Sequence, residues 1–278
     1  MNYRHAFHAG NFADVFKHIV LTLLLKSLHR KDTPFCYVDT HAGAGRYDLT
    51  SEAAQKTGEY RDGIWRLWDM NPLPELADYL AAVRASNADG TLHYYPGSPA
   101  IARFFMRPID RMVLLELQAD ECALLQARFA GDRQVVVQRQ DGYAGLKAYL
   151  PPKEKRGLVL IDPPYESDRE YEQVVEGLKV AHDRWSSGIF ALWYPIKARP
   201  PIERFHRVLA ATGIRKMLLA EFAPYPEDSS FRLNGCGMVV VNPPWKLEET
   251  LRRLLPELLD VLRQHPAART GLSWLVPE

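Results

Sequence analysis

The sequence predicts an α/β fold with a mostly parallel central sheet. Short apolar runs alternate with longer segments in which apolar residues recur at helical spacing, a pattern typical of repeated strand–helix units. Several of the short runs end at an acidic residue, and ligands bind beyond the carboxyl ends of strands in such sheets. With 278 residues, 47% of them hydrophobic, the chain is suited to one large domain over residues 1–278.

The first elements are a helix and a short strand. Asn11 is a favourable N-cap residue in front of an apolar pattern at helical spacing, which predicts a helix over 12–29. A strand follows at 35–39 and ends in the turn His41–Gly45.

The alternation of strands and helices then stops. Helices are predicted over 52–70 and 75–87, around the proline-containing stretch Asn71-Pro72-Leu73-Pro74. This stretch is acidic overall, and we interpret residues from about 50 to 95 as a small helical insertion beside the ligand cleft.

The alternation resumes near residue 111. Further strands are predicted at 111–116, 134–138, 157–162, 188–194, 214–222 and 237–242. Further helices are predicted at 119–130, 142–150, 168–184, 201–211 and 247–264. Repeated units of this kind place helices on both faces of the sheet.

Composition excludes several classes of protein. The isolated cysteines Cys36, Cys122 and Cys236 argue against a disulfide framework and favour a reducing compartment. No signal core and no apolar stretch long enough to span a bilayer are present, so we expect a soluble, cytoplasmic protein. Separately, we expect a monomer. His5 and His8 have H-x-x-H spacing, but no Cys or carboxylate cluster completes a site, so we expect no metal.

The formal net charge of +1 hides an uneven distribution. Residues 1–31 contain five Lys or Arg residues against one Asp, and residues 197–216 contain six against one Glu. Both segments are suited to contact phosphates, although basic faces are as often simply solvated. Charge alone therefore permits a nucleic-acid partner without identifying one.

Acidic residues at successive strand ends suggest a nucleoside-bearing ligand. Asp39 precedes a turn in which Gly43 lets the backbone approach a ligand closely, but the turn lacks the third glycine of the dinucleotide fingerprint. Glu116 is placed to accept the hydroxyls of a ribose, and Asp141-Gly142 to accept from an adenine amine. Asp141 alone is better explained as a helix cap. Taken as one site, the set fits the methyl donor S-adenosylmethionine.

The most informative motif is Asp162-Pro163-Pro164-Tyr165, directly after the apolar run 157–161. It places a carboxylate, two rigid backbone carbonyls and an aromatic ring at a strand end. The carboxylate and the Pro163 carbonyl are suited to accept hydrogen bonds from an exocyclic amine, while Tyr165 stacks on the heterocycle. The motif therefore predicts methylation of a nucleobase amine.

Two other features have competing explanations. Asn242-Pro243-Pro244-Trp245 has the same pattern, but it ends a late strand, and its prolines are better explained as a strand end and helix start. His18 and His41 are suited to bind the donor, and equally to be buried residues satisfied by backbone.

Segments spread over the whole chain carry a family resemblance. They are Tyr3-Arg4-His5, Phe7-His8-Ala9-Gly10-Asn11, Ala13-Asp14-Val15, Lys17-His18, Asp39-Thr40-His41-Ala42-Gly43-Ala44-Gly45-Arg46-Tyr47, Tyr95-Pro96-Gly97-Ser98-Pro99, Asp162-Pro163-Pro164-Tyr165-Glu166, and Ser273-Trp274 with Val276-Pro277-Glu278. Together they resemble the bacterial RlmJ family, S-adenosylmethionine-dependent enzymes that methylate N6 of one adenine in 23S ribosomal RNA. The resemblance implies a class I methyltransferase fold, Rossmann-like, with a small helical insertion.

The resemblance also implies roles for individual residues. Donor contacts are expected from His18, His41, Gly43, Ser98, Glu116, Asp141, Gly142 and Asp162. Catalytic roles are expected for Asp162, Pro163 and Tyr165, and contacts to the target RNA for Pro164, Tyr165, Arg4 and Lys17.

The expected function is methylation of adenine N6 in 23S ribosomal RNA that is naked or partly assembled. The same chemistry on DNA adenine or on a guanine amine of ribosomal RNA is an alternative. A non-catalytic RNA-binding protein that keeps a relic donor pocket is another.

Overall fold

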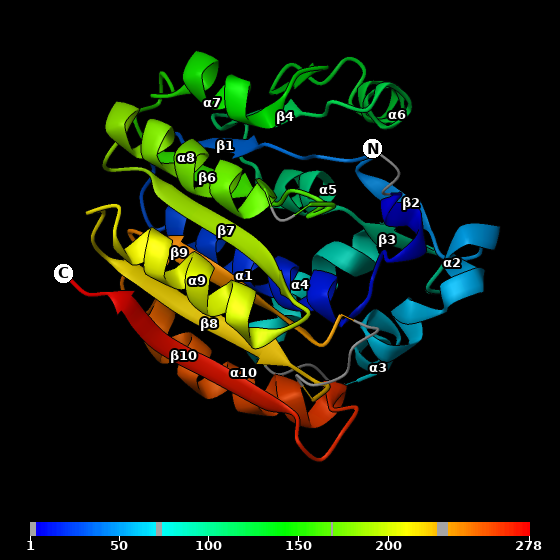
Figure 1. Ribbon diagram of the computed structural model, residues 1–278. Helices are drawn as coiled ribbons and strands as arrows, with labels where there is room; N and C mark the ends of the chain where they lie inside the picture. The colour runs from blue at the N-terminus through cyan, green and yellow to red at the C-terminus, as the bar shows by residue number, and fades with distance from the viewer. Residues whose placement is uncertain (1–3, 71–73, 168, 227–232) are drawn as a thin grey trace.

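The computed structural model describes residues 4–70, 74–167, 169–226 and 233–278. Tyr3, residues 71–73 of the proline-containing stretch and residue 168, where a helix was predicted to begin, lie outside them. The centre of the molecule is an eight-stranded sheet with the order β10-β8-β9-β7-β6-β1-β4-β5 (Figure 1). Its strands are β1 Cys36–Asp39, β4 Arg111–Leu115, β5 Val135–Gln138, β6 Gly157–Ile161, β7 Ile189–Ile196, β8 Met217–Ala223, β9 Gly235–Val241 and β10 Arg269–Val276.

Most of the sheet is parallel, which confirms the predicted fold class. β5, β4, β1, β6 and β7 pair in parallel. β9 runs antiparallel to both β7 and β8, and β10 runs antiparallel to β8. The carboxyl ends of β1, β4, β5, β6 and β7 therefore meet at one edge of the sheet, while β9 ends at the opposite edge.

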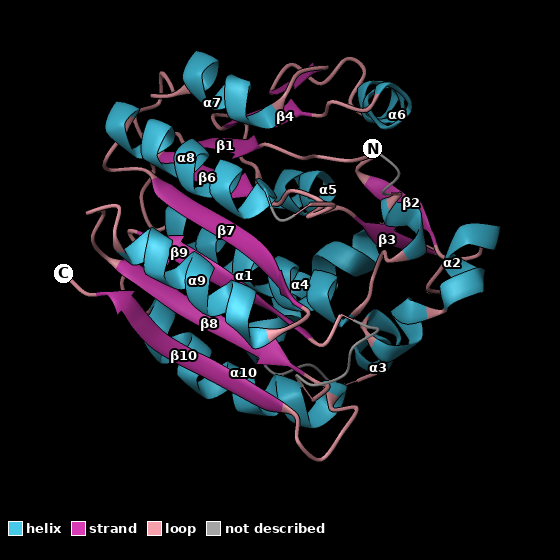
Figure 2. Ribbon diagram, in the orientation of Figure 1, coloured by secondary structure: helices cyan, strands magenta, loops and turns pink. Residues whose placement is uncertain are grey.

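Helices cover both faces of the sheet (Figure 2). One face packs against α7 Gly142–Tyr149, α8 Arg169–Arg184 and α9 Arg199–Ala210. The other packs against α1 Phe12–Leu28, α5 Ser98–Phe105 and α10 Leu247–Leu262, and α6 Ala119–Arg128 adds Leu125 to that core. Two separate apolar cores, one on each face, thus hold the sheet between helical layers.

Helix α1 begins as the sequence predicts. The Asn11 side chain accepts hydrogen bonds from the backbone N–H groups of Ala13 and Asp14. Nearly every residue of the helix is buried, including the polar side chains of Asp14, Lys17 and His18. Because buried charges need partners, these residues indicate that the helix makes specific polar contacts in addition to apolar packing.

The segment interpreted as an insertion is more broken than predicted. The expected helix 52–70 is divided into α2 Glu52–Thr57, the 3-10 turn η2 Glu59–Asp62 and α3 Ile64–Trp68. Gly58, at φ +66, ends α2 in the left-handed conformation that glycine adopts easily. α4 Pro74–Ala85 follows, and β2 Arg46–Asp48 pairs with β3 Tyr94–Pro96 on either side of these helices.

Some elements carried no sequence prediction. The short strands β2 and β3, helix α5 and the C-terminal strand β10 belong to this group, as does the 3-10 turn η1 His5–Phe7. None of the helices within the described ranges is long and apolar enough to cross a membrane.

The tight pairing of β1 and β6 yields a first prediction. A Cβ atom at Gly157 would lie 1.9 Å from the Cys36 carbonyl oxygen, so Gly157→Ala has to separate the two strands. We expect a loss of about 3 kcal/mol in the free energy of unfolding, measured by urea denaturation. Gly213→Ala is the control, because Gly213 has φ +80 but open space around it, and should cost only about 1 kcal/mol. Equal losses would contradict the close approach.

Candidate active site

A cavity of about 1020 Å³ opens at the carboxyl ends of the parallel strands. Its walls come from the start of α1, the turn after β1, the strand ends of β4 and β6, and strand β7. This volume is at the upper end of what small-ligand sites have, so it can hold a nucleoside and a further base together.

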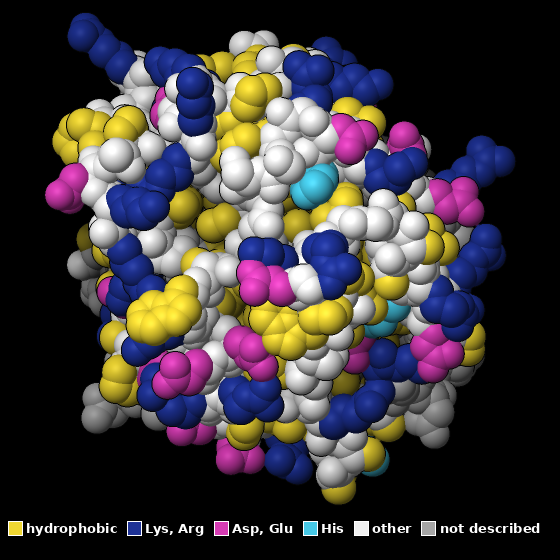
Figure 3. All heavy atoms as spheres, turned by 90° about the vertical axis from the view of Figure 1, so that its left-hand side faces the viewer, with side chains coloured by type: hydrophobic (Ala, Val, Ile, Leu, Met, Phe, Trp, Pro, Cys, Tyr) yellow, Lys and Arg dark blue, Asp and Glu magenta, His cyan; other side chains and the backbone are white. Residues whose placement is uncertain are grey.

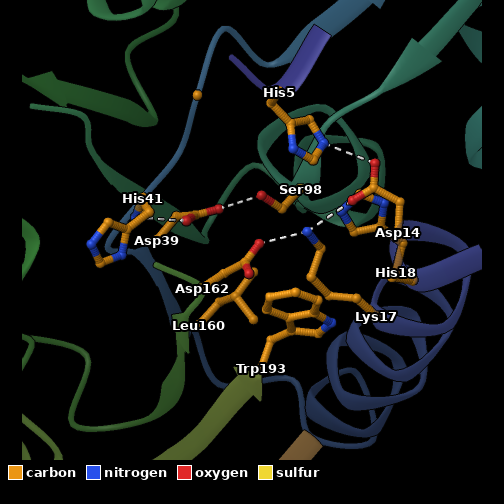
Figure 4. Close-up of polar contacts among 12 residues, drawn as sticks. His5, Asp14, Lys17, His18, Asp39, His41, Ser98, Leu160, Asp162 and Trp193 are labelled. Carbon is orange, nitrogen blue, oxygen red and sulfur yellow. Dashed lines mark hydrogen bonds and ion pairs between the residues drawn. The ribbon is translucent and has the colours of Figure 1, made fainter. Parts of the chain in front are cut away.

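A chain of charged side chains crosses the floor of the cavity (Figure 4). Lys17 Nζ donates to Asp162 Oδ2 at 2.5 Å and contacts Asp14 Oδ1 at 2.9 Å. The other oxygen of Asp14 accepts from the Gly10 N–H at 2.9 Å and bonds the His5 ring at 2.8 Å. The sequence-predicted catalytic carboxylate is therefore tied to helix α1 and, through it, to the N-terminal segment.

Electrostatics stabilise the charged forms along this chain. Burial opposes the charge of Lys17, but the carboxylates of Asp14 and Asp162 outweigh burial and raise the pKa of Lys17 above its ordinary value. Burial likewise opposes the charge of Asp14, yet His5 and Lys17 hold the pKa of Asp14 well below its usual range. Lys17 is thus a permanent cation beside Asp162.

Glu116 bridges two turns at the cavity wall. Its carboxylate accepts from the Gly43 N–H at 2.8 Å and from the Gln118 N–H at 2.7 Å. Burial raises the pKa of Glu116 above its ordinary value. Two backbone donors hold the side chain still, and its remaining acceptor capacity faces the cavity.

Asp39 does not line the cavity, but it holds residues that do. Its side chain is fully buried and accepts hydrogen bonds from the hydroxyls of Tyr37 and Ser98, both at 2.7 Å, and from the His41 N–H at 3.3 Å. Burial raises the pKa of Asp39 to about 6. Asp39 is absent from the described residues that line the cavity, whereas Ser98 and His41 are among them.

Asp141 and Gly142 lie together at the mouth of the cavity. The Asp141 carboxylate caps α7 by accepting from the Ala144 N–H at 2.8 Å, so the capping explanation of this residue is correct. A Cβ atom at Gly142 would lie 2.3 Å from the Thr40 carbonyl oxygen. Glycine is therefore needed here for the approach of α7 to the turn after β1.

His18 and His41 are the two histidines expected to contact the donor. The buried His18 ring bonds the Tyr95 hydroxyl through Nδ1 at 2.8 Å, and its Nε2 has no hydrogen-bond partner among the described residues. Burial holds the pKa of His18 well below its usual range and lowers that of His41 to about 4. Both rings line the cavity as neutral imidazoles, and the buried, unpaired Nε2 of His18 is a vacant contact for a polar ligand.

The rest of the Asp-Pro-Pro-Tyr motif also lines the cavity. Tyr165, at φ +50, is only 6% exposed. Its hydroxyl donates to the Trp193 carbonyl at 2.8 Å, and its ring centroid lies 4.8 Å from that of Tyr171. The ring is thus anchored to strand β7 and presents limited area to a ligand.

The residues expected to contact RNA lie in different environments. Arg4 is exposed just before η1 and does not line the cavity, whereas Lys17 is engaged in the buried ion pairs. In the second basic segment Lys197 lines the cavity, while Arg199 pairs with the carboxylate of Glu221 at 2.9 Å.

Sequence reasoning missed several residues at the site. His8 and Asn11 both bond the carboxylate of Glu59 at 3.0 Å, which joins the N-terminal segment to the 3-10 turn η2. The Lys17 ammonium lies over Trp193, 5.7 Å from the centroid of the Trp193 ring. No local signal pairs these positions, because Glu59 and Trp193 are far along the chain from their partners. No cluster of three metal-binding side chains occurs in the part of the chain that is described.

Comparisons with known proteins identify the family of the chain. The family model described as "Ribosomal RNA large subunit methyltransferase D, RlmJ" matches residues 32–276. "Ribosomal RNA large subunit methyltransferase J" of Escherichia coli (strain K12) is 48% identical over 279 residues and covers 100% of both chains. The protein of the same name from Haemophilus influenzae (strain ATCC 51907 / DSM 11121 / KW20 / Rd) is 45% identical over 280 residues with equal coverage.

A solved structure is similar throughout. The crystal structure of protein LPL1258 from Legionella pneumophila has a TM-score of 0.89 and 35% identity, and the match covers 96% of this chain and 98% of that one. The family expected from the sequence motifs is therefore confirmed. The chain belongs to the RlmJ family of ribosomal RNA large subunit methyltransferases.

Proposed function

We propose that this protein transfers the methyl group of S-adenosylmethionine to N6 of an adenine in 23S ribosomal RNA. The observation that carries the proposal is the fixed Asp162 carboxylate at the cavity floor. Lys17 contacts Oδ2, and the described residues provide no hydrogen bond to Oδ1. Oδ1 is therefore available to accept from an exocyclic amine.

The residues that would hold the donor fit a nucleoside. Glu116 offers a buried carboxylate oxygen to ribose hydroxyls, and the unpaired Nε2 of His18 offers a polar contact deeper in the cavity. Gly43, Ser98 and His41 border the same space, with Asp141 and Gly142 at its mouth. When bound, S-adenosylmethionine supplies an electrophilic methyl group on a positively charged sulfur.

The acceptor half of the cavity suits a purine that has left its stack. Flipping a base costs a few kcal/mol, which stacking and hydrogen bonds in the pocket offset. We assign the adenine to the space beside Asp162, Pro163 and Pro164, with the edge of Tyr165 against its ring. Asp162 and the Pro163 carbonyl orient the amine, so the contribution of these residues is position and electrostatics.

The basic segments supply the contacts to RNA in this proposal. Lys197, in the second basic segment, borders the cavity. Arg4, in the N-terminal basic segment, is exposed. Because the base must be reachable, naked or partly assembled RNA in the cytoplasm is the proposed substrate.

The direct test is incubation of the purified protein with isotopically labelled S-adenosylmethionine and protein-free 23S RNA, 16S RNA or duplex DNA. We expect labelled N6-methyladenosine in the 23S RNA digest by mass spectrometry. Label in DNA or on a guanine would favour the alternative acceptors. Calorimetry without donor binding would favour a non-catalytic RNA-binding protein.

Replacement of the catalytic carboxylate has a specific expected signature. Asp162→Asn keeps the shape but weakens the acceptor, and we expect the methylation rate to fall roughly 10²- to 10⁴-fold while donor binding survives. The exposed Asp183→Asn is the matched control and should retain full activity. Near-normal turnover by Asp162→Asn would refute the assignment.

Tyr165 is expected to matter less than Asp162. Tyr165→Phe loses the hydrogen bond to Trp193 but keeps the ring, so we expect it to stay closer to wild type in single-turnover methylation than Tyr165→Ala. Tyr165→Ala should in turn retain more activity than Asp162→Ala, because other apolar contacts still hold the base. Equal total loss in both alanine variants would show that stacking limits the reaction.

Donor binding tests the role of Glu116 separately. Glu116→Gln replaces the charged acceptor with an amide, and we expect the donor Kd measured by calorimetry to rise about tenfold. Asp120→Asn, an exposed acid at the start of the nearby helix α6, is the control and should bind normally. An unchanged Kd in Glu116→Gln would remove Glu116 from the donor site.

A further inference from the structure

Trp245 belongs to the second Pro-Pro-aromatic motif, Asn242-Pro243-Pro244-Trp245, and does not line the cleft. Its side chain is 75% exposed, more than any other large hydrophobic side chain of the described residues. It follows β9, which runs antiparallel to β7, so it lies at the edge of the sheet opposite the cleft. Figure 3 shows that side of the molecule, where Lys and Arg side chains are interspersed with acidic and apolar ones.

The loop that carries Trp245 is rigidly mounted. The Asn242 side chain donates to the carbonyl oxygens of Ser186 and Gly188, each at 2.8 Å, and so ties the loop to the start of β7. Asn242 and Lys246 both have positive φ, at +53 and +70, on either side of the two prolines and the indole. Left-handed backbone at non-glycine residues costs energy, and it is typical of sites where a side chain must be held in place.

Two cations flank the exposed indole. The Lys246 ammonium lies 4.4 Å from the ring centroid, and the Arg30 guanidinium 5.7 Å. Arg30 also donates to the Trp245 carbonyl at 3.2 Å. Within the described ranges neither cation pairs with a carboxylate, so their charge is available to an anionic ligand.

Helix α1 connects this site to the cleft. Its first turns line the catalytic cavity, and its last residues, with Arg30, line a hollow of about 500 Å³ beside Trp245. At 1.5 Å per residue the helix spans about 25 Å. An RNA segment that follows the surface over this distance reaches both places.

We propose that Trp245, Arg30 and Lys246 form a second RNA-binding site, which holds an unpaired nucleotide of the same RNA whose adenine occupies the cleft. The base stacks on the indole, and Arg30 and Lys246, both on flexible stems, turn toward the adjacent phosphates. This inference rests on the proposed function, because it assumes that RNA is the substrate.

Charge complementarity favours RNA over a protein partner at this surface. Exposed tryptophan and arginine also occur in protein interfaces. Here, however, two cations that pair with no carboxylate of the described residues lie against one aromatic ring, and cations beside an aromatic ring are a combination that binds single-stranded nucleic acid. Trp274 provides a contrast, because its indole donates to the Glu248 carboxylate at 2.8 Å.

The test compares two RNAs with the full-length protein. One is protein-free 23S RNA, and the other is an adenine-containing oligonucleotide of a few nucleotides, too short to leave the cleft. The readout is the ratio of the two Kd values, together with the ratio of the two KM values for methylation. We expect Trp245→Ala to reduce the preference for 23S RNA about tenfold. Trp245→Phe should recover most of it, because the ring is retained.

Variants of the two cations test the phosphate contacts, and a variant of a second exposed tryptophan is the matched control. Arg30→Gln and Lys246→Gln should each lower the slope of log Kd against log salt by about one for 23S RNA. Trp274→Ala, an exposed indole with an acidic partner, should leave the preference unchanged.

Two outcomes separate this inference from the function on which it rests. An unchanged preference in Trp245→Ala, with methylation of 23S RNA intact in the wild type, would overturn the second site alone. Absence of methylation of 23S RNA by the wild type, with no preference for it in binding, would overturn both.

Discussion

The ion pair between Lys17 and Asp162 is the interaction on which the cleft depends. It joins helix α1 to the end of β6, and both partners are largely buried, with side chains 6% and 15% exposed. A buried charge that loses its partner costs about 3–5 kcal/mol, so the pair holds these elements in one arrangement. Asp14 extends the linkage to His5 and to the Gly10 N–H. The Asp162 carboxylate, which we propose to be catalytic, and the N-terminal residues His5 and Gly10 are therefore positioned by the same set of contacts.

Strand direction explains why only one of the two similar motifs lies at the cavity. Asp162 follows β6, which is parallel to β1, so its side chain joins those of the neighbouring strand ends. Asn242 follows β9, which is antiparallel to β7, and ends at the other edge of the sheet. Chain order along the sequence favoured the Asp162 motif, and strand direction is the physical reason that Asp162 lines the cavity and Asn242 does not. The direction of a strand in the sheet depends on which distant strands it pairs with, and local residue patterns do not contain this information.

The fold and the strand-end residues were predictable, whereas their partners were not. Apolar periodicity located most strands and helices of the main sheet to within a few residues, and Asn11 marked the start of α1. The very short strands β2 and β3 lack enough residues to show a period, and the edge strand β10 is too exposed to show clear alternation. Lys17 was expected to contact RNA, and its ion pair with Asp162 was missed. The two residues are distant in sequence, and only the packing of α1 on β6 brings them together.

A crystal structure with S-adenosylhomocysteine and a short adenine-containing RNA would test the central claim most directly. The distance from the adenine N6 to an Asp162 carboxylate oxygen should lie within hydrogen-bonding range, about 2.7–3.2 Å, with N6 facing the sulfur and Lys17 still bound to the other oxygen. A purine held elsewhere in the cavity, with Asp162 turned away from N6, would contradict it.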